Sequence, residues 1–214
     1  MNTIAETLRK SGIVPVVTIT DPAQAVPTAR ALEAGGIPCI EVTFRTPAAA
    51  DAIREITTQV PGVTVGAGTV LTRKQAHSAR RAGAQFIVAP GYNPRIVRWC
   101  IRKKMPVFPG VNNPSDIESA LENGLSLLKF FPAEASGGIA MLAALAGPYP
   151  SVSFMPTGGI SRSNLADYIE RDNVFAVGGS WMVKKELIEN EEWETITRLA
   201  REAAEIVTST REKK

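Results

Sequence analysis

The stretch Leu127-Leu128-Lys129-Phe130-Phe131-Pro132 is a short run of large apolar side chains that ends at a proline. Such a run is typical of a buried β-strand that stops at Pro132. The same pattern recurs along the chain: an apolar run ends in a glycine or proline turn, and a helical segment follows it. The turns fall about 19–24 residues apart, at Gly68, Pro90, Pro109, Pro132, Pro156 and Gly178. This spacing predicts repeated βα units.

Eight strands and the helices between them follow from this pattern. The predicted strands cover residues 13–19, 37–44, 63–67, 86–89, 106–108, 127–131, 152–155 and 174–177. The predicted helices cover residues 1–10, 23–34, 48–59, 73–82, 94–103, 114–122, 139–145, 162–170 and 191–207. Eight βα units in 214 residues favour a (β/α)8 TIM barrel with a short N-terminal helix over an open doubly wound sheet.

The domain organisation follows from the same pass along the chain. No linker or low-complexity segment interrupts it, so residues 1–214 are predicted to form one barrel domain. The stretch Val65-Gly66-Ala67-Gly68 follows a strand, as a dinucleotide fingerprint would. Leu71 stands where the third glycine of that fingerprint belongs, so we reject a Rossmann interpretation.

Composition excludes several classes of function. The net charge is +3, but charges of both signs are interspersed and only residues 211–214 resemble a basic tail, so nucleic acid is not an expected partner. Cys39 and Cys100 lack metal-ligand spacing and indicate a reduced, cytoplasmic protein. His77, the only histidine, lies in a polar helical stretch and gives no support to a zinc site. No apolar run approaches the ~20 residues that span a bilayer, so no membrane association is expected.

Lys129 is the unusual residue of the opening stretch. On a strand it shares one face with Leu127 and Phe131. A lysine buried among such neighbours loses the hydration of its charge, which favours the neutral amine, a nucleophile. Alternatively, its stem is buried and its ammonium pairs with a carboxylate. This stretch by itself leaves both interpretations open.

The second predicted strand carries further polar groups. Alternation along Ile40-Glu41-Val42-Thr43-Phe44-Arg45 places Glu41, Thr43 and Arg45 on one face. In a barrel whose apolar face meets helices, Glu41 and Arg45 would point inward. Buried charges are costly unless they pair or act. An ion pair of Glu41 with Arg45 or with Lys129 therefore competes with a catalytic role.

Two glycine turns follow the last two predicted strands. They are Thr157-Gly158-Gly159-Ile160-Ser161 and Gly178-Gly179-Ser180. In barrels, turns at these positions form the usual phosphate site, because glycine lets backbone N–H groups approach an anion. Alternatively, these glycines only relieve crowding between strands and helices.

Five ordered motifs resemble a known family over nearly the whole chain. This family is the class I aldolases that cleave 2-keto-3-deoxy-6-phosphogluconate (KDPG) and also handle 4-hydroxy-2-oxoglutarate (KHG). The matching motifs are Glu41-Val42-Thr43-Phe44-Arg45-Thr46, Gly66-Ala67-Gly68-Thr69-Val70, Lys129-Phe130-Phe131-Pro132-Ala133-Glu134, Pro156-Thr157-Gly158-Gly159-Ile160 and Val177-Gly178-Gly179-Ser180-Trp181.

The resemblance implies a lyase with a role for each matching residue. Lys129 would form the Schiff base with the substrate, Glu41 would move protons, and Arg45 and Thr69 would hold the pyruvyl carboxylate. The wall would be shaped by Pro90 and Phe131, and the polar and phosphate end would be lined by Thr157, Gly158, Gly159, Gly179 and Ser180. The resemblance further implies a cytoplasmic homotrimer of the Entner-Doudoroff pathway. It would take a small 2-oxo acid phosphate as substrate and need no metal or cofactor.

Departures from the family pattern concern loops after strands. Asn112-Asn113 and Tyr92-Asn93 replace the residues common there, which leaves the preferred aldehyde open. The alternatives are a 2-keto-3-deoxy-6-phosphogalactonate aldolase and a non-catalytic trimeric barrel scaffold. An epimerase or a thiamine phosphate synthase would need metal-binding histidines or carboxylates at strand ends, which the sequence does not offer.

Overall fold

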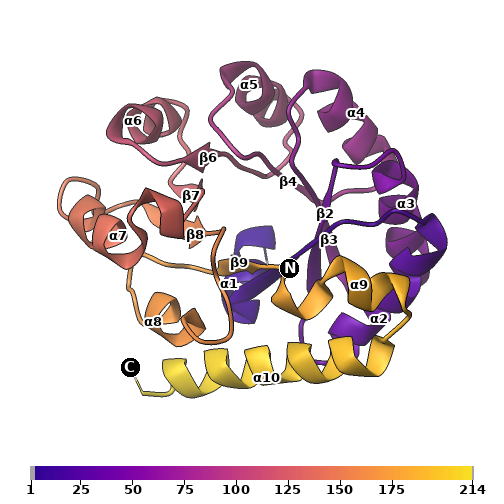
Figure 1. Ribbon diagram of the computed structural model, residues 1–214. Helices are drawn as coiled ribbons and strands as arrows, with labels where there is room; N and C mark the ends of the chain where they lie inside the picture. The colour runs from indigo at the N-terminus through magenta and orange to yellow at the C-terminus, as the bar shows by residue number, and fades with distance from the viewer. Residues whose placement is uncertain (1–2, 214) are drawn as a thin grey trace.

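Parallel strands form the centre of the molecule in the computed structural model, which describes residues 3–213 (Figure 1). Within this described range, all seven pairings between strands are parallel. The strands are β1 Ile13–Val17, β2 Cys39–Thr43, β3 Thr64–Gly68, β4 Phe86–Val88, β5 Val107–Phe108, β6 Gly110–Val111, β7 Leu127–Phe130, β8 Ser153–Pro156 and β9 Val177–Gly179.

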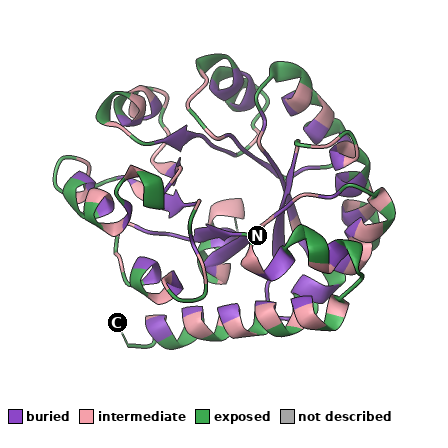
Figure 2. Cartoon of the chain, viewed as in Figure 1, coloured by how far each residue is buried: buried purple, intermediate pink, exposed green. Residues whose placement is uncertain are grey.

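Helices surround these strands on the outside (Figure 1). They are α1 Ile4–Ser11, α2 Ala25–Ala34, α3 Ala49–Gln59, α4 Arg73–Ala82, α5 Pro94–Arg102, α6 Pro114–Glu122, α7 Gly138–Ala146, α8 Leu165–Ile169, α9 Lys185–Glu189 and α10 Trp193–Arg211. Three short 3-10 helices are η1 Pro22–Gln24, η2 Glu134–Ser136 and η3 Trp181–Val183. Each larger helix turns a buried face toward the strands and an exposed face outward (Figure 2).

The strands divide into two sheets at Pro109. One sheet has the order β5-β4-β3-β2-β1-β9, and the other has the order β6-β7-β8. β5 pairs with β4 and β6 pairs with β7 on either side of Pro109, whose carbonyl accepts a hydrogen bond from the Lys129 N–H at 2.9 Å. Isolated bridges, Phe154 with Val174 and Thr157 with Gly178, join the segments of β8 and β9. The parallel α/β fold is confirmed, and closure into a complete (β/α)8 barrel stays a prediction.

Two predicted strands are wrong in extent. The fifth, over 106–108, misses β6, because the chain resumes its pairing after Pro109. The eighth, over 174–177, begins too early, because β9 contains the glycines that were assigned to a turn. Pairing of Val177, Gly178 and Gly179 with β1 sets this position. A contact so distant in sequence leaves no local signal.

The predicted helices agree better with the structure, and their errors lie near the ends of the chain. The N-terminal helix begins at Ile4 with a capping box between Thr3 and Glu6, while Met1 and Asn2 lie outside the described residues. The helix predicted over 162–170 shrinks to α8, and the terminal helix runs four residues further, to Arg211. η3 and α9 lie outside the predicted helices.

The interior is filled mainly by β-branched residues, leucine, alanine and aromatic rings. Phe108 packs between Phe86 and Phe175, with 5.8 Å between ring centroids on each side. Burial of each such ring stabilises the fold by about 2–3 kcal/mol. Along 3–213, no helix is both long and apolar enough to cross a membrane.

Candidate active site

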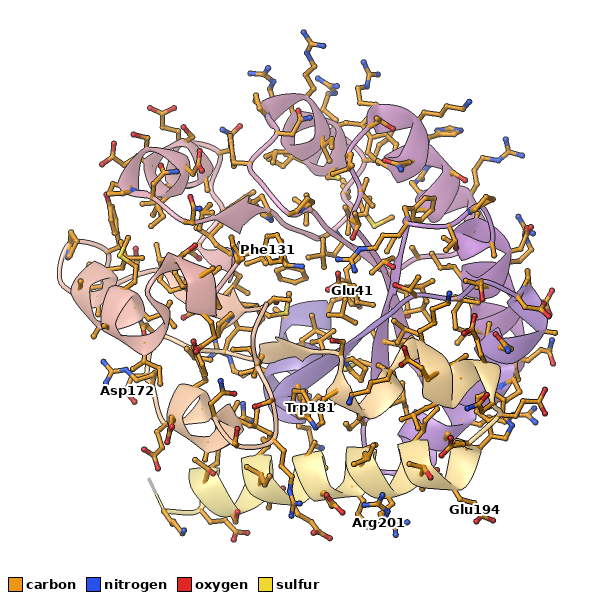
Figure 3. All side chains as sticks on the ribbon, in the orientation of Figure 1. Glu41, Phe131, Asp172, Trp181, Glu194 and Arg201 are labelled. Atoms are coloured by element: carbon orange, nitrogen blue, oxygen red, sulfur yellow. The ribbon has the colours of Figure 1, made fainter. Side chains whose placement is uncertain are left out.

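Lys129 and Glu41 meet in the interior from two strands that are far apart in sequence. Lys129 lies on β7 and Glu41 on β2, and their Nζ and Oε1 atoms are 3.6 Å apart. Lys129 is 4% exposed and Glu41 is fully buried. The Nζ atom also lies 5.1 Å from the centroid of the Phe131 ring, and Figure 3 shows Glu41 and Phe131 within the space that the strands surround. Of the two ion pairs considered for Glu41, with Arg45 or with Lys129, the structure shows the pair with Lys129.

The Glu41 carboxylate is positioned by steric contact with its surroundings and not by hydrogen bonds. Neither of its carboxylate oxygens has a hydrogen-bond partner. A Cβ atom placed on Gly68 would lie 2.1 Å from Oε1 of Glu41, so this carboxylate lies against the backbone of β3. The Lys129 ammonium, 3.6 Å away, is the ion-pair partner of this carboxylate. The two groups therefore lie close enough for a proton to pass between them, directly or through one water.

A cavity of about 320 Å³ opens beside this pair. Phe131 belongs to both, because its ring lies next to the Lys129 ammonium and also lines the cavity. Six further predicted site residues line the same cavity: Arg45, Thr157, Gly158, Gly159, Gly179 and Ser180. The structure thus brings the glycine turns, the arginine and the lysine pair into one region.

The glycine turn after β8 has a backbone that other residues rarely adopt. Gly158 and Gly159 have φ angles of 100° and 80°. The backbone N–H of Ala133 donates to the Thr157 carbonyl at 2.8 Å, and the N–H of Glu134 donates to the Gly158 carbonyl at 3.1 Å. The segment after β7 therefore fastens this turn at the mouth of the cavity.

Thr69 and Pro90 do not line this cavity. Each adjoins a glycine that lies next to Glu41 or Lys129. Thr69 follows Gly68 directly and has a φ of 52°, which is strained for a β-branched residue and is typical of functional sites. The Pro90 carbonyl lies against Gly110, where a Cβ atom would be only 2.2 Å from its oxygen. Gly110 in turn pairs with Lys129 in register.

Arg45 is placed differently from the prediction. Strand β2 ends at Thr43, and Arg45 lies in the exposed turn that follows, so the alternation of the strand does not reach it. Buried Thr43 instead shares a hydrogen bond of 2.9 Å with Thr18. The expectation of an inward Arg45 is therefore wrong. Arg45 nevertheless lines the same cavity as Phe131 and the glycine turns.

Sequence reasoning missed charged residues at the far end of the cavity. Lys184, Lys185 and Glu186 line it, just beyond Ser180. They form no motif and follow η3, which was not predicted. Nothing in the sequence therefore distinguished these three residues from ordinary surface charges.

Tyr168 was also missed. Its hydroxyl donates a hydrogen bond to Glu134, and its pKa is raised mainly by burial and further by this hydrogen bond. Among residues 3–213, no three His, Cys, Asp or Glu side chains gather as metal ligands.

The fold and the site together define a class of protein: a parallel α/β protein with a buried lysine–carboxylate pair next to an open, glycine-lined cavity. The family model described as KDPG and KHG aldolase matches residues 4–199. A protein of Treponema pallidum (strain Nichols), named 2-dehydro-3-deoxy-phosphogluconate aldolase, is 50% identical over 207 residues, which are 97% of this chain and 99% of that protein.

Solved structures with similar folds include two KDPG aldolases. That of Legionella pneumophila, with pyruvate captured at low pH as a covalent carbinolamine intermediate, has a TM-score of 0.90 and 40% identity, and the match covers 94% of this chain and 97% of that one. That of Zymomonas mobilis ZM4, with 3-phosphoglycerate, has a TM-score of 0.86 and 41% identity, with 92% and 93% covered. The chain belongs to the KDPG and KHG aldolase family.

Proposed function

We propose that this protein is a lyase that cleaves KDPG to pyruvate and glyceraldehyde 3-phosphate through a Schiff base on Lys129. The observation that carries the proposal is the buried Lys129–Glu41 pair beside a cavity rich in glycine. The KDPG aldolase of Legionella pneumophila, with its covalent carbinolamine of pyruvate, supports the same chemistry here. We also propose cleavage of KHG to pyruvate and glyoxylate, because both substrates share the 4-hydroxy-2-oxo acid unit.

The proposed reaction follows from the two buried groups. Glu41 takes a proton from Lys129, and the neutral amine attacks the C2 ketone to form a carbinolamine. Glu41 returns this proton to the carbinolamine hydroxyl, which leaves as water. Glu41 is then a carboxylate again, and the iminium that remains acts as an electron sink. Glu41, directly or through a water, then accepts the proton of the C4 hydroxyl while the C3–C4 bond breaks. The electron pair of the broken C3–C4 bond forms an enamine. Protonation of the enamine at C3 and hydrolysis of the resulting imine then release pyruvate.

The remaining predicted residues are assigned to binding in this proposal. Arg45 and Thr69 hold the pyruvyl carboxylate, and Pro90 and Phe131 shape the wall beside the imine. The polar and phosphate end consists of Thr157, Gly158, Gly159, Gly179 and Ser180. Support for this assignment comes from the shared cavity, and the 3-phosphoglycerate held by the Zymomonas mobilis aldolase is a phosphate ester of similar size.

The first experiment is to incubate the protein with pyruvate and borohydride and to measure its intact mass. The native chain is expected to gain one reduced pyruvyl group, because borohydride reduces the imine on Lys129 to a stable amine. Lys129→Ala is expected to gain none. Absence of the adduct on the native chain would overturn the aldolase proposal.

We also infer that residues 1–214 form a single closed (β/α)8 barrel and that the protein is a cytoplasmic homotrimer. Pro109 alone separates β5 from β6, and isolated bridges link the segments of β8 and β9, which supports closure. The trimer rests on the resemblance to the family, and native mass measurement tests it. The relatives reported above are named for phosphogluconate, so neither the phosphogalactonate enzyme nor the scaffold is favoured.

A further inference from the structure

The cavity carries more positive than negative charge. Arg45, Lys184 and Lys185 line it, against the single carboxylate of Glu186. The proposed substrate carries an anion at each end, a carboxylate beside the imine and a phosphate at the far end. Arg45 is assigned to the carboxylate, which leaves the two lysines to be assigned.

The two lysines differ in their partners. Lys185 pairs with Glu189 on the next turn of α9, with 3.3 Å between Nζ and Oε1. Lys184 takes part in none of the ion pairs found along residues 3–213. A lysine in a carboxylate pair has part of its charge neutralised, whereas an unpaired lysine keeps its donors free for an anion. Lys184 is therefore the better candidate for a phosphate contact.

Lys184 also projects from a well-anchored backbone. It lies between buried Val183 and the start of α9, and its carbonyl accepts hydrogen bonds from the N–H groups of Leu187 and Ile188 at 3.1 and 3.3 Å. Val183 N–H donates to the Ser180 carbonyl at 3.1 Å, which joins this turn to the proposed phosphate end. The side chain can thus reach the cavity without reordering the backbone.

We propose that Lys184 recognises the terminal phosphate and sets the preference of this protein for phosphorylated over unphosphorylated 2-oxo acids. This inference rests on the proposed aldolase function. Glu186 opposes Lys184, because it lines the same cavity and its negative charge repels a phosphate dianion. Opposite effects of the two residues on phosphate affinity are the signature of an electrostatic role.

The test measures binding of glycerol 3-phosphate by isothermal titration calorimetry at low salt. Lys184→Gln is expected to weaken binding about fivefold, which is the upper range for an exposed ion pair. Glu186→Gln is expected to tighten binding about twofold, and both effects should shrink at high salt. Lys103→Gln, which removes an exposed lysine outside the cavity, serves as the control and should leave the dissociation constant unchanged.

Kinetics provide a second measurement. Lys184→Gln is expected to lower kcat/KM for KDPG several-fold more than kcat/KM for unphosphorylated KHG. An unchanged ratio, or weaker glycerol 3-phosphate binding in both Lys184→Gln and Glu186→Gln, would overturn the inference in favour of a structural role. If the native chain forms no pyruvyl adduct, the aldolase proposal fails, and calorimetry still decides whether Lys184 binds phosphate.

Discussion

Glycine residues at the site leave space for larger side chains of neighbouring strands. Gly68 on β3 makes room for Glu41, and Gly178 on β9 makes room for Thr157, whose Oγ1 would lie 2.2 Å from an added Cβ. Neither glycine has a positive φ, so conformational freedom does not explain them. Their role is steric, and it concerns residues on the adjacent strand or segment.

Gly68→Ala is expected to displace Glu41 and to impair proton transfer. The added methyl would meet the carboxylate oxygen at 2.1 Å, and the buried side chain has to move to avoid it. Loss of a well-placed general base lowers kcat by about 100-fold or more. Steady-state release of pyruvate from KDPG measures this effect, with circular dichroism to confirm folding.

Gly91→Ala is the matched control for this substitution. No atom lies within 4 Å of the position of its Cβ, and its φ is not positive. Its kcat should equal that of the native chain. A Gly68→Ala protein that folds and turns over KDPG at the native rate would contradict the proposed role of Glu41.

At the scale of elements, one hydrogen bond joins α8 to the segment after β7. The Tyr168 hydroxyl donates to Glu134, and Tyr168 is fully buried. Glu134 also lies against Gly159, where an added Cβ would be 2.4 Å from its Cγ. Through Glu134, helix α8 therefore helps to position the glycine turn at the mouth of the cavity.

Tyr168→Phe is expected to destabilise the fold by about 1–2 kcal/mol, because it removes the donor for a charged acceptor. Urea denaturation measures the free energy of unfolding. Tyr149→Phe is the control: its hydroxyl also donates to a glutamate, Glu118 at 3.0 Å, but at an exposed position. Its effect should stay within about 0.5 kcal/mol. Equal losses in both variants would contradict a special role for the Tyr168 contact.

At the scale of the whole molecule, folding buries both thiols in the interior. Cys39 and Cys100 are fully buried, and burial raises the pKa of each to about 12 from 9.0. Below pH 9 the folded and unfolded states both keep these protons. Between 9 and 12 the unfolded thiols lose protons that the folded thiols retain, so the free energy of unfolding falls as pH rises.

The expected slope reaches at most about 1.4 kcal/mol per pH unit for each thiol. Urea denaturation at several pH values between about 8 and 10 measures it. The double variant Cys39→Ala, Cys100→Ala should lose this part of the pH dependence, whatever its stability at neutral pH. An equally steep decline in the double variant would show that other groups cause it.

Much of the fold and the two residues of the central pair, though not their pairing, could be predicted from the sequence. The strand containing Lys129, the strand containing Glu41 and the glycine turn at Gly158 were placed close to their observed positions, since apolar runs and turn residues act locally. The predicted inward orientation of Arg45 was wrong, because the end of β2 is set by its pairing with β3. Lys184 was missed, because a lysine after an unpredicted turn resembles any solvated lysine.

Three properties could be inferred from the amino-acid sequence alone: the alternation of strands and helices, the polar residues near the strand ends and the family that the motifs resemble. These properties depend on neighbours in the chain, on apolar periodicity and on turn chemistry. Three other features emerged only from the folded chain: Glu41 pairs with Lys129, the strands divide into two sheets at Pro109, and β9 begins at Val177. Each of these depends on contacts between segments distant in sequence, and their geometry exists only once the chain has folded.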